Sequence, residues 1–446
     1  MAERIDFQMN KMKESNQKNY VIHPETNPQQ VVFDEALSPK KATNQDTFNT
    51  YINEHKMSTL VDVSAYGVIP DGVTDCTPLL NKLLKEKTTK GITYYFPPCD
   101  VNQFYRFSST INIPSGQPIV EFKTVGQATF KFESMVAFNV AIESFTIDGF
   151  NLWLPVGAQS GKGIFFNDTR DYNRFDFDLF VRNCSLNEAT YAVVTKGRGV
   201  TLENNLFSNV SQAIIKTSFK DVNTIWQPDD INSRGTGYRG FFVKNNRIHF
   251  CTAIIIDNSA DFQNVINFCE IVNNTIEGGA SYYSGFAHNL LVQGNNHFLA
   301  YGNRDALFMF QDAKDVYIDL NVYSRDATTE GGTSTAVSRA VVVYGSYRNF
   351  RLTGKLYRCN GHVITLYGGG RNFYCDLMAS EAPLQNGYRF IQTADARVTY
   401  DGFVVRGLSN STATNTPMIY RAPLTTFYNR KIDHVLTGPN SGNVYN

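Results

Sequence analysis

The stretch of residues 216–240 holds the side chains that cleavage of a sugar polymer requires. Asp229 and Asp230 stand next to each other in it, close to Trp226, which is one of only two tryptophans in the chain. Hydrolysis of a glycosidic bond uses two carboxyl groups that flank the bond, about 5 Å apart for retention and roughly 6.5–9.5 Å apart for inversion. An aromatic ring beside them offers a flat apolar surface to a sugar. The stretch therefore predicts a polysaccharide site.

Adjacent residues usually point apart, so one of these two aspartates needs a partner from elsewhere in the chain. Asp257 ends the apolar run TAIIID about one repeat later and is the first candidate, while Glu277 and Asp305 are weaker ones. We therefore predict Asp229, Asp230 and Asp257 as the catalytic residues. The alternative is a turn in which the two adjacent aspartates are solvated.

Substrate-binding residues are predicted in and just after the same stretch. They have aromatic, cationic or imidazole side chains: Trp226, Arg234, Tyr238, Arg239 and His249. Elimination beside a uronate carboxylate is a second chemistry, in which a basic side chain accepts the proton. The bases near enough in sequence are Lys216, Arg234, Arg239 and His249.

No metal site and no cofactor are expected. His288, His297 and His362 stand near strand ends without a paired ligand at metal spacing. The seven cysteines contain no CxxC pair, so we interpret them as free thiols, several of them facing the core.

A repeated unit must position these residues. Five strand-like runs between residues 181 and 298 each contain one or two asparagines: VRNCSL, VTLENNLF, FVKNNRIHF, CEIVNNTIE and LLVQGNNHF. We align them on the following residues: Asn183, Asn204-Asn205, Asn245-Asn246, Asn273-Asn274 and Asn295-Asn296. A period in the low twenties built from short β-branched and aromatic runs is typical of a solenoid of strands. We therefore expect a parallel β-helix.

The asparagines are expected to turn the corners of this solenoid. Asparagine tolerates the left-handed backbone region better than other non-glycine residues, and stacked amides can hydrogen-bond along a column. The spacing has one outlier, because 41 residues separate Asn205 from Asn246 and the excess falls on residues 216–240. Insertions in solenoids form loops on one face, which is often the binding face.

The period returns nearer the C-terminus. Arg348-Asn349-Phe350 recurs as Arg371-Asn372-Phe373, and Tyr344-Gly345 recurs as Tyr367-Gly368, both 23 residues later. Two landmarks with one spacing predict that the coils continue through this region.

Composition excludes some partners. The chain has 41 basic and 41 acidic residues, so no overall field favours nucleic acid or an anionic membrane. No run of eighteen apolar residues occurs, and the first residues, MAERIDFQMNKMKES, lack the apolar core of a signal peptide. We expect a soluble protein without a Sec-type export signal.

The segment VDVSAYGVIPDGVTDCTPLL predicts a strand, turns at Gly67 and Asp71-Gly72, and a helix with Thr77 as N-cap and Pro78 in first position. A leucine stripe on this helix would cover the open end of the solenoid. The segment, followed by a Phe-Pro step and a Tyr-Arg-Phe strand, resembles the N-terminal signature of the pectate-lyase-like superfamily of bacteriophage tailspikes and capsule depolymerases. Cys76 stands where the family commonly has a second acid.

This resemblance implies an all-β, right-handed, single-stranded parallel β-helix with an N-terminal capping helix, assembled as a homotrimer and carried on a phage virion. We expect a virion-attachment or leader segment at 1–56, a cap at 57–119, the β-helix body at 120–407 and a C-terminal cap or trimerisation region at 408–446. The expected partners are a bacterial surface polysaccharide and virion tail proteins. The signature residues shape the cap in this family and are not catalytic.

The predicted function is that of a tailspike which binds and hydrolyses the polysaccharide. Three alternatives remain: a lyase of the same fold, an adhesin that binds the glycan without cutting it, and a free secreted enzyme, which would need a signal peptide.

Overall fold

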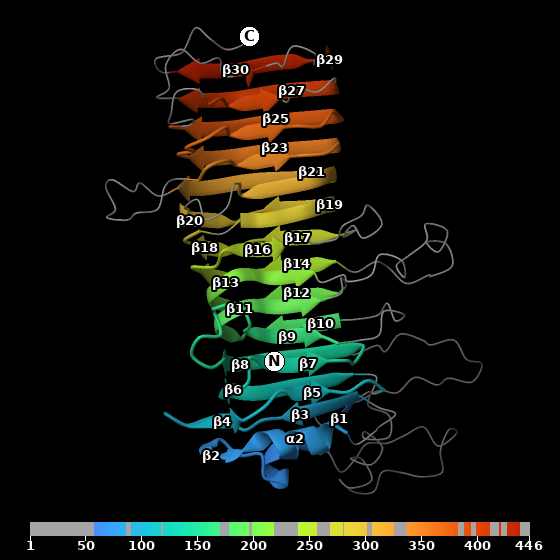
Figure 1. The fold of residues 1–446 in the computed structure, drawn as a ribbon, viewed down its shortest axis with the longest axis vertical. Coiled ribbons are helices and arrows are strands. Elements are labelled where there is room, and N and C mark those ends of the chain that lie inside the picture. The colour runs from blue at the N-terminus through green and yellow to red at the C-terminus, as the bar shows by residue number, and fades with distance from the viewer. Residues whose placement is uncertain are drawn as a thin grey trace, which may run out of the picture.

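The computed structural model describes residues 58–85, 91–116, 119–169, 178–195, 199–217, 240–256, 268–279, 281–300, 306–324, 337–381, 388–393, 398–410, 419–420 and 426–437. Within these ranges the chain winds into one tall stack of strands, with the only long helix at the N-terminal end (Figure 1). Every strand pairing recorded between coils is parallel. The structure is a single parallel β-helix, which confirms the predicted fold.

Three sheets form the sides of the stack, and we name them faces A, B and C in the order in which the chain visits them. Face A contains the short strands β1 (Ser58–Asp62), β3 (Gly91–Tyr95), β10 (Asp178–Arg182), β12 (Val200–Glu203), β14 (Phe241–Lys244) and β17 (Cys269–Val272). Face B contains β2 (Asp71–Asp75), β4 (Phe104–Phe107), β15 (Arg247–His249), β18 (Thr275–Glu277) and β20 (Asn296–Ala300). Face C contains β5 (Ile111–Ile113), β7 (Val136–Val140), β9 (Ile164–Asp168), β16 (Ala253–Ile256), β22 (Val341–Val343), β24 (Ile364–Leu366), β26 (Ile391–Thr393) and β28 (Ile419–Tyr420).

Longer strands bend from one face to the next. Those that run from face A to face B are β6 (Val120–Phe132), β8 (Ser144–Trp153), β23 (Tyr347–Tyr357), β25 (Gly370–Ser380), β27 (Thr399–Asn410) and β30 (Lys431–Thr437). Two strands, β11 (Ser185–Thr195) and β13 (Leu206–Thr217), run from face B to face C, and β19 (Ser281–Gln293) runs from face C to face A. The longest, β21 (Phe308–Ser324), passes through faces C, A and B. The short strand β29 (Thr426–Tyr428) pairs with the start of β27. Coil pairing thus continues as far as Thr437.

The helix α2 (Cys76–Leu84) takes the place that a face C strand has in the coils above it. Leu80, Leu83 and Leu84 are buried against the core. The Asn81 side chain reaches the edge of β5, where its amide donates to the carbonyl of Thr110 (3.3 Å) and its oxygen accepts from the Asn112 N–H (2.9 Å). The helix therefore covers the first coil and satisfies backbone groups of its edge strand, as predicted.

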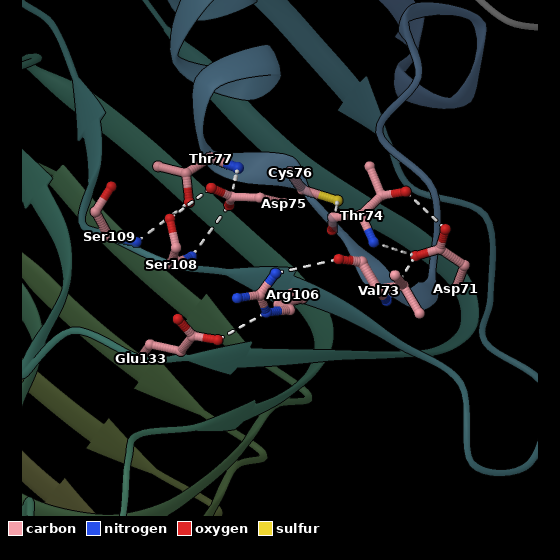
Figure 2. A network of polar contacts seen from close by, with 10 residues as sticks. All are labelled: Asp71, Val73, Thr74, Asp75, Cys76, Thr77, Arg106, Ser108, Ser109 and Glu133. Atoms are coloured by element: carbon pink, nitrogen blue, oxygen red, sulfur yellow. Dashed lines mark hydrogen bonds and ion pairs between the residues drawn. The ribbon is translucent and has the colours of Figure 1, made fainter.

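The helix begins two residues earlier than expected. Its N-cap is Asp75, whose carboxylate accepts from the Thr77 N–H (3.0 Å) and from the Ser108 hydroxyl (2.5 Å) (Figure 2). The predicted N-cap, Thr77, lies inside the helix, and Pro78 is the third helical residue. Asp75 also binds the next coil at Ser108, and the Thr77 hydroxyl accepts from the Ser109 N–H (3.3 Å), so both residues tie the start of the helix to that coil. Burial acts to raise the pKa of Asp75, but hydrogen bonds from Ser108 and Thr77 bring it down to about 2.

The rest of the cap signature is structural as well. Asp71 closes a turn by accepting from the N–H (2.7 Å) and hydroxyl (2.6 Å) of Thr74. Arg106 donates to the Val73 carbonyl (3.1 Å) and pairs with Glu133 (2.7 Å), which ties the cap to the coil above (Figure 2). Cys76 is fully buried, so the residue that replaces the family's second acid packs in the core. The turn at Gly67 begins earlier than predicted. Val63 is the first residue of the short 3-10 helix η1 (Val63–Tyr66), which ends at Gly67, and is not part of β1.

Aromatic and aliphatic side chains fill the interior. Phe350, Phe373 and Phe403 form a stacked column, with ring centroids 5.6 and 5.0 Å apart. All seven cysteines are free thiols and all except Cys99 are buried, which agrees with the sequence prediction. Among the described residues, no helix has the length and apolar character needed to cross a membrane.

Buried asparagines line the corner between faces A and B. Four of them, Asn205, Asn246, Asn274 and Asn295, are at most 2% exposed. The oxygen of each of the last three accepts from the backbone N–H and the side-chain amide of the asparagine one coil earlier, at 2.8–3.1 Å. We call this column the interior ladder.

The residue before each ladder asparagine turns the corner. Asn204, Asn245 and Asn273 have positive φ, and Gly294 does the same for Asn295. The two asparagines of a pair therefore have separate roles. In the last coil the functional pair is Gly294-Asn295, which corrects the predicted alignment on Asn295-Asn296, since glycine supplies the left-handed residue there.

A second column of polar side chains lies on the outside, where the chain enters face A. Asp315, Asn349 and Asn372 all have positive φ. The Asn349 amide donates to Asp315 (2.6 Å), and the Asn372 amide donates to Asn349 (2.8 Å). We call this column the exterior ladder. Its register, with Arg348 opposite Arg371, confirms the 23-residue period found in the sequence.

Candidate functional site

Most of the predicted site lies outside the described residues. This applies to Trp226, Asp229, Asp230, Arg234, Tyr238, Arg239, Asp257 and Asp305. Lys216, His249 and Glu277 lie within them. The catalytic assignment therefore stays a prediction. The described strands show only where the segments that contain these residues leave the β-helix and rejoin it.

The strands on either side of these segments are neighbours. β13 and β16 pair on face C, with Lys216 opposite Ile256, and β14 and β17 pair on face A, with Phe241 opposite Cys269. The connections that carry Asp229-Asp230 and Asp257 therefore both join face C to face A, in consecutive coils. The partnership between Asp257 and one of the two adjacent aspartates stays a prediction.

Lys216 is held at this corner by an aromatic residue of the coil before it. Its Nζ donates to the Tyr191 hydroxyl (3.3 Å) and lies 4.6 Å from the centroid of the same ring. Both residues are partly buried on the outer side of face C. Lys216 thus has a fixed position beside the connection that begins after Thr217.

His249 and Glu277 come together on a different face. They are opposite each other on β15 and β18 of face B, with His249 Nε2 4.0 Å from Glu277 Oε2. Both side chains are more than a third exposed. The predicted binding residue His249 therefore contacts a weaker acid candidate, and the pair faces outward from face B, away from the face C to face A corner.

Two exposed aromatic residues, Phe298 and Phe250, lie next to this pair. Phe298 is opposite Glu277 in the next coil and is 50% exposed. Phe250, which follows His249, is 52% exposed and has a φ of 52°, a strained conformation for a bulky side chain. Its ring lies on Gly278, where an added Cβ would be 3.0 Å from Phe250 Cδ1. Neither Phe250 nor Phe298 was predicted from the sequence; the signal that could have found them is an aromatic residue at the end of the runs FVKNNRIHF and LLVQGNNHF.

Further along face B the surface stays aromatic and polar. Tyr323 and Tyr357 stack with ring centroids 4.7 Å apart, and the Tyr357 hydroxyl donates to Glu381 (3.1 Å). Burial and this hydrogen bond raise the pKa of Tyr357, so it is a neutral donor. Beside them lies a hollow of about 290 Å³, whose lining includes Asn296, Asp319, Asn321 and Lys355. We call the surface from His249 to Tyr357 the face B patch.

The face B patch can bind a polyhydroxylated ligand. It offers aromatic planes, amide donors and acceptors, two carboxylates and a lysine on strands that the solenoid holds rigid. Glu277 can accept a proton or a hydroxyl hydrogen bond, with His249 beside it. Within the described ranges, no group of three or more histidine, cysteine or acidic residues is placed to hold a metal ion.

Comparisons with known proteins find similarity at the level of structure. No protein-family model matches the chain. No curated protein matches its sequence. Among solved structures, it is similar to the surface adhesin PfbA of Streptococcus pneumoniae, at 11% identity over 85% of this chain and 92% of that one, with a TM-score of 0.35.

Two further solved structures are similar to a comparable degree. A GH87 α-1,3-glucanase catalytic unit from Streptomyces thermodiastaticus matches at 12% identity over 86% of this chain and 68% of that one, with a TM-score of 0.39. The tailspike protein of Acinetobacter phage vB_ApiP_P1 matches at 10% identity over 83% of this chain and 60% of that one, with a TM-score of 0.31. At these identities the likeness is one of fold.

Proposed function

We propose that this protein is a tailspike-type receptor-binding protein that binds a bacterial surface polysaccharide. The observation that carries the proposal is the face B patch, where Phe250, Phe298 and Tyr323 remain exposed beside amides and carboxylates on a rigid solenoid. An extended surface of this composition suits a long glycan chain, which can contact several coils at once. The cap signature, whose residues form the network of Figure 2, supports the tailspike assignment by resemblance.

Cleavage by hydrolysis is the second part of the proposal. Asp229 or Asp230 would act with Asp257 as the two carboxyl groups, one as acid and the other as base or nucleophile. Trp226, Arg234, Tyr238 and Arg239 would hold the sugar at that corner. The pairing of β13 with β16 supports this arrangement, because both segments leave face C at neighbouring positions.

Assembly and location complete the proposal. We propose a homotrimer on a phage tail, with residues 1–56 as the attachment segment, 57–119 as cap, 120–407 as body and 408–446 as the C-terminal cap or trimerisation region. The protein would act at the bacterial cell surface.

The experiment is an incubation of the purified protein with capsular, O-antigen and wall polysaccharides. Binding is followed by retention on immobilised polymer, and cutting by reducing ends and by the ultraviolet absorbance of unsaturated uronates. Binding with new reducing ends alone is the expected result. Both signals together would indicate a lyase, for which the fixed contact between Lys216 and Tyr191 offers a basic group next to a hydroxyl.

A non-cutting adhesin is the second candidate function. The described part of the patch favours it in one respect, since aromatic and amide groups bind sugars without any reaction. The variants Asp229→Asn and Asp230→Asn separate the two functions. In an enzyme, the variant of whichever aspartate is catalytic abolishes reducing-end release and preserves binding, whereas in an adhesin neither the parent nor the variants release reducing ends.

A further inference from the structure

A second concave surface lies near the N-terminal end of the stack, several coils from the face B patch. It is a hollow of about 470 Å³ on the outer side of β4, β6 and β8, and its lining includes Trp153 and Phe104. Its volume falls in the range of roughly 300–1,000 Å³ that is typical of small-ligand pockets. We call it the Trp153 pocket.

The strands build the floor of this pocket in two columns. Phe104, Thr129 and Asn151 follow one another across β4, β6 and β8, and Lys131 is opposite Trp153 two residues further along. Adjacent strands are about 4.8 Å apart, so these side chains form a compact array. Trp153 is 37% exposed, and it is the only described tryptophan.

A turn forms the wall. Gln103 N–H donates to the Asp100 carbonyl (3.0 Å), and Asn102 has a φ of 69°, which asparagine tolerates. Cys99 fixes the turn to β6 by donating its N–H to the Gln127 carbonyl (2.9 Å) and by accepting from the Thr129 N–H at its sulfur (3.3 Å). The wall is therefore held in place before any ligand arrives.

The chemistry of the lining selects a type of ligand. Indole and phenyl rings can cover the apolar face of a sugar ring, while the amides of Gln103, Gln127 and Asn151 can bind its hydroxyls. The charged residues balance, with Asp100 on one side and Lys131 on the other. The ammonium of Lys131 lies 4.0 Å from the centre of the Phe104 ring. This cation–π contact already uses one side of the ammonium.

We infer that the Trp153 pocket binds an uncharged pyranose unit of a glycan. An acidic sugar would meet the carboxylate of Asp100, and a purely apolar ligand would make no use of the amide donors of Gln103, Gln127 and Asn151. The inference extends the proposed function, since it adds a second contact for the same class of polymer at the end of the rod. It does not depend on catalysis or on the face B patch.

The two tryptophans allow a test that separates the two sites. Protein labelled with 5-fluorotryptophan gives one ¹⁹F resonance for Trp153 and one for Trp226, which the variants Trp153→Phe and Trp226→Phe assign. The probes are the methyl glycosides of glucose, galactose, rhamnose and N-acetylglucosamine, with glucuronic acid for comparison. We expect a saturable shift of the Trp153 resonance with at least one neutral glycoside, and a weaker response to glucuronic acid.

Variants in the lining sharpen this result. Asn151→Ala and Gln103→Ala each should weaken the Trp153 response by about fivefold to tenfold, as expected for a lost hydrogen bond. Gln103 is on the turn and not in a strand. If Asn151→Ala does not fold, Gln103→Ala can still be used to measure the loss of an amide from the pocket lining. Tyr428→Ala, an exposed aromatic change at the other end of the stack, should leave the Trp153 response unchanged.

The other outcomes overturn the inference in different ways. A shift of Trp226 alone would remove the Trp153 pocket and leave the proposed function in place. Tighter binding of glucuronic acid would contradict the uncharged class. No shift of either resonance would overturn the inference, while the polymer assay would still decide the proposed function.

Discussion

The two polar ladders use the same residue type for different purposes. In the interior ladder, Asn246 is 1% exposed and has a positive-φ neighbour that turns the corner for it. In the exterior ladder, Asn349 is exposed, takes the positive φ itself and also makes the amide contact. The interior asparagine is thus required for its hydrogen bonds, and the exterior one mainly for its backbone conformation.

The difference follows the shape of the coil. Where the interior ladder runs, short strands such as β12 and β14 stop at a sharp corner between faces A and B. In the C-terminal coils, β23 and β25 bend through that corner without stopping, and the sharp turn is at the start of face A. A buried corner must satisfy its polar groups inside the protein, whereas water can do so at an exposed one.

The largest effect is expected for Asn246→Ala. Its side chain accepts from the Asn205 N–H (2.9 Å) and donates to the Leu202 carbonyl (3.0 Å) and to Asn274 (3.0 Å). Loss of the amide leaves these buried groups unsatisfied, at about 1–3 kcal/mol each. We expect the free energy of unfolding to fall by about 3 kcal/mol or more, measured by guanidinium denaturation.

A matched control for this variant is Asn321→Ala, which removes an exposed amide contact to Asn296 (2.6 Å). It should cost less than about 1 kcal/mol. Equal losses in the two variants would show that burial does not decide how much stability a lost amide contact costs.

The dependence of stability on pH tests the role of buried His297, which follows the last asparagine of the interior ladder by two residues. His297 lies inside the coil that follows Asn295, with Nε2 2.7 Å from the Gly278 carbonyl, and burial lowers its pKa to about 4. Because the unfolded chain binds this proton at about pH 6.5, stability is complete above that pH and falls as the pH drops towards 4. The expected loss is about 3 kcal/mol between pH 7 and pH 4.

The variant His297→Gln tests the cause, since glutamine can still donate to the Gly278 carbonyl. Unfolding midpoints measured from pH 7 to pH 4 should change less in this variant than in the parent. His362, whose pKa burial also lowers to about 4, provides the remaining dependence in both proteins. Identical pH profiles would refute the role of His297.

Paired substitutions at Asn349 sharpen the comparison on the exterior side. Asn349→Ala places an alanine at a φ of 53°, at a cost of about 1–2 kcal/mol. Asn349→Gly removes the same side chain but accepts this conformation. Thermal unfolding should therefore rank glycine well above alanine; similar values for both would mean that the amide contact and not φ matters.

The smallest effect concerns the start of the interior ladder. Cys184 has the ladder position one coil before Asn205, where its N–H donates to Asn205 (2.9 Å) and its sulfur lies 3.8 Å from the Ile147 carbonyl. Cys184→Asn would place an amide at the same carbonyl, as each ladder asparagine does. We expect a gain of about 0.5–1 kcal/mol in chemical denaturation, and a loss would show that the ladder cannot be extended.

The sequence predicted the solenoid, its period and its lid because these depend on repeated apolar and turn residues. It did not predict which asparagine of each pair faces inward. The two residues are of the same type, and only their position relative to the corner between faces A and B distinguishes them. The N-cap was misplaced at Thr77 because the partner of Asp75, Ser108, is distant in sequence.

The candidate site was harder to predict than the fold. His249 was selected for its closeness to residues 216–240 in the chain, yet its side chain faces outward from face B, with Glu277. Phe298 and Phe250 stand one and two residues after the inward-facing positions of His297 and Ile248, and neither was predicted as a site residue from the sequence. A solenoid places neighbours in space about one period apart, so closeness in sequence is a poor guide to a site.

The most direct test of the account is the size of a bacterial polysaccharide after incubation with the parent protein and with Asp229→Asn, Asp230→Asn and Asp257→Asn. Size-exclusion chromatography measures the chain length, and retention on immobilised polymer measures binding. We expect the parent to shorten at least one polymer, and we expect Asp257→Asn and one of Asp229→Asn and Asp230→Asn to bind it without shortening it. A protein that neither binds nor shortens any capsular, O-antigen or wall polysaccharide would contradict the account.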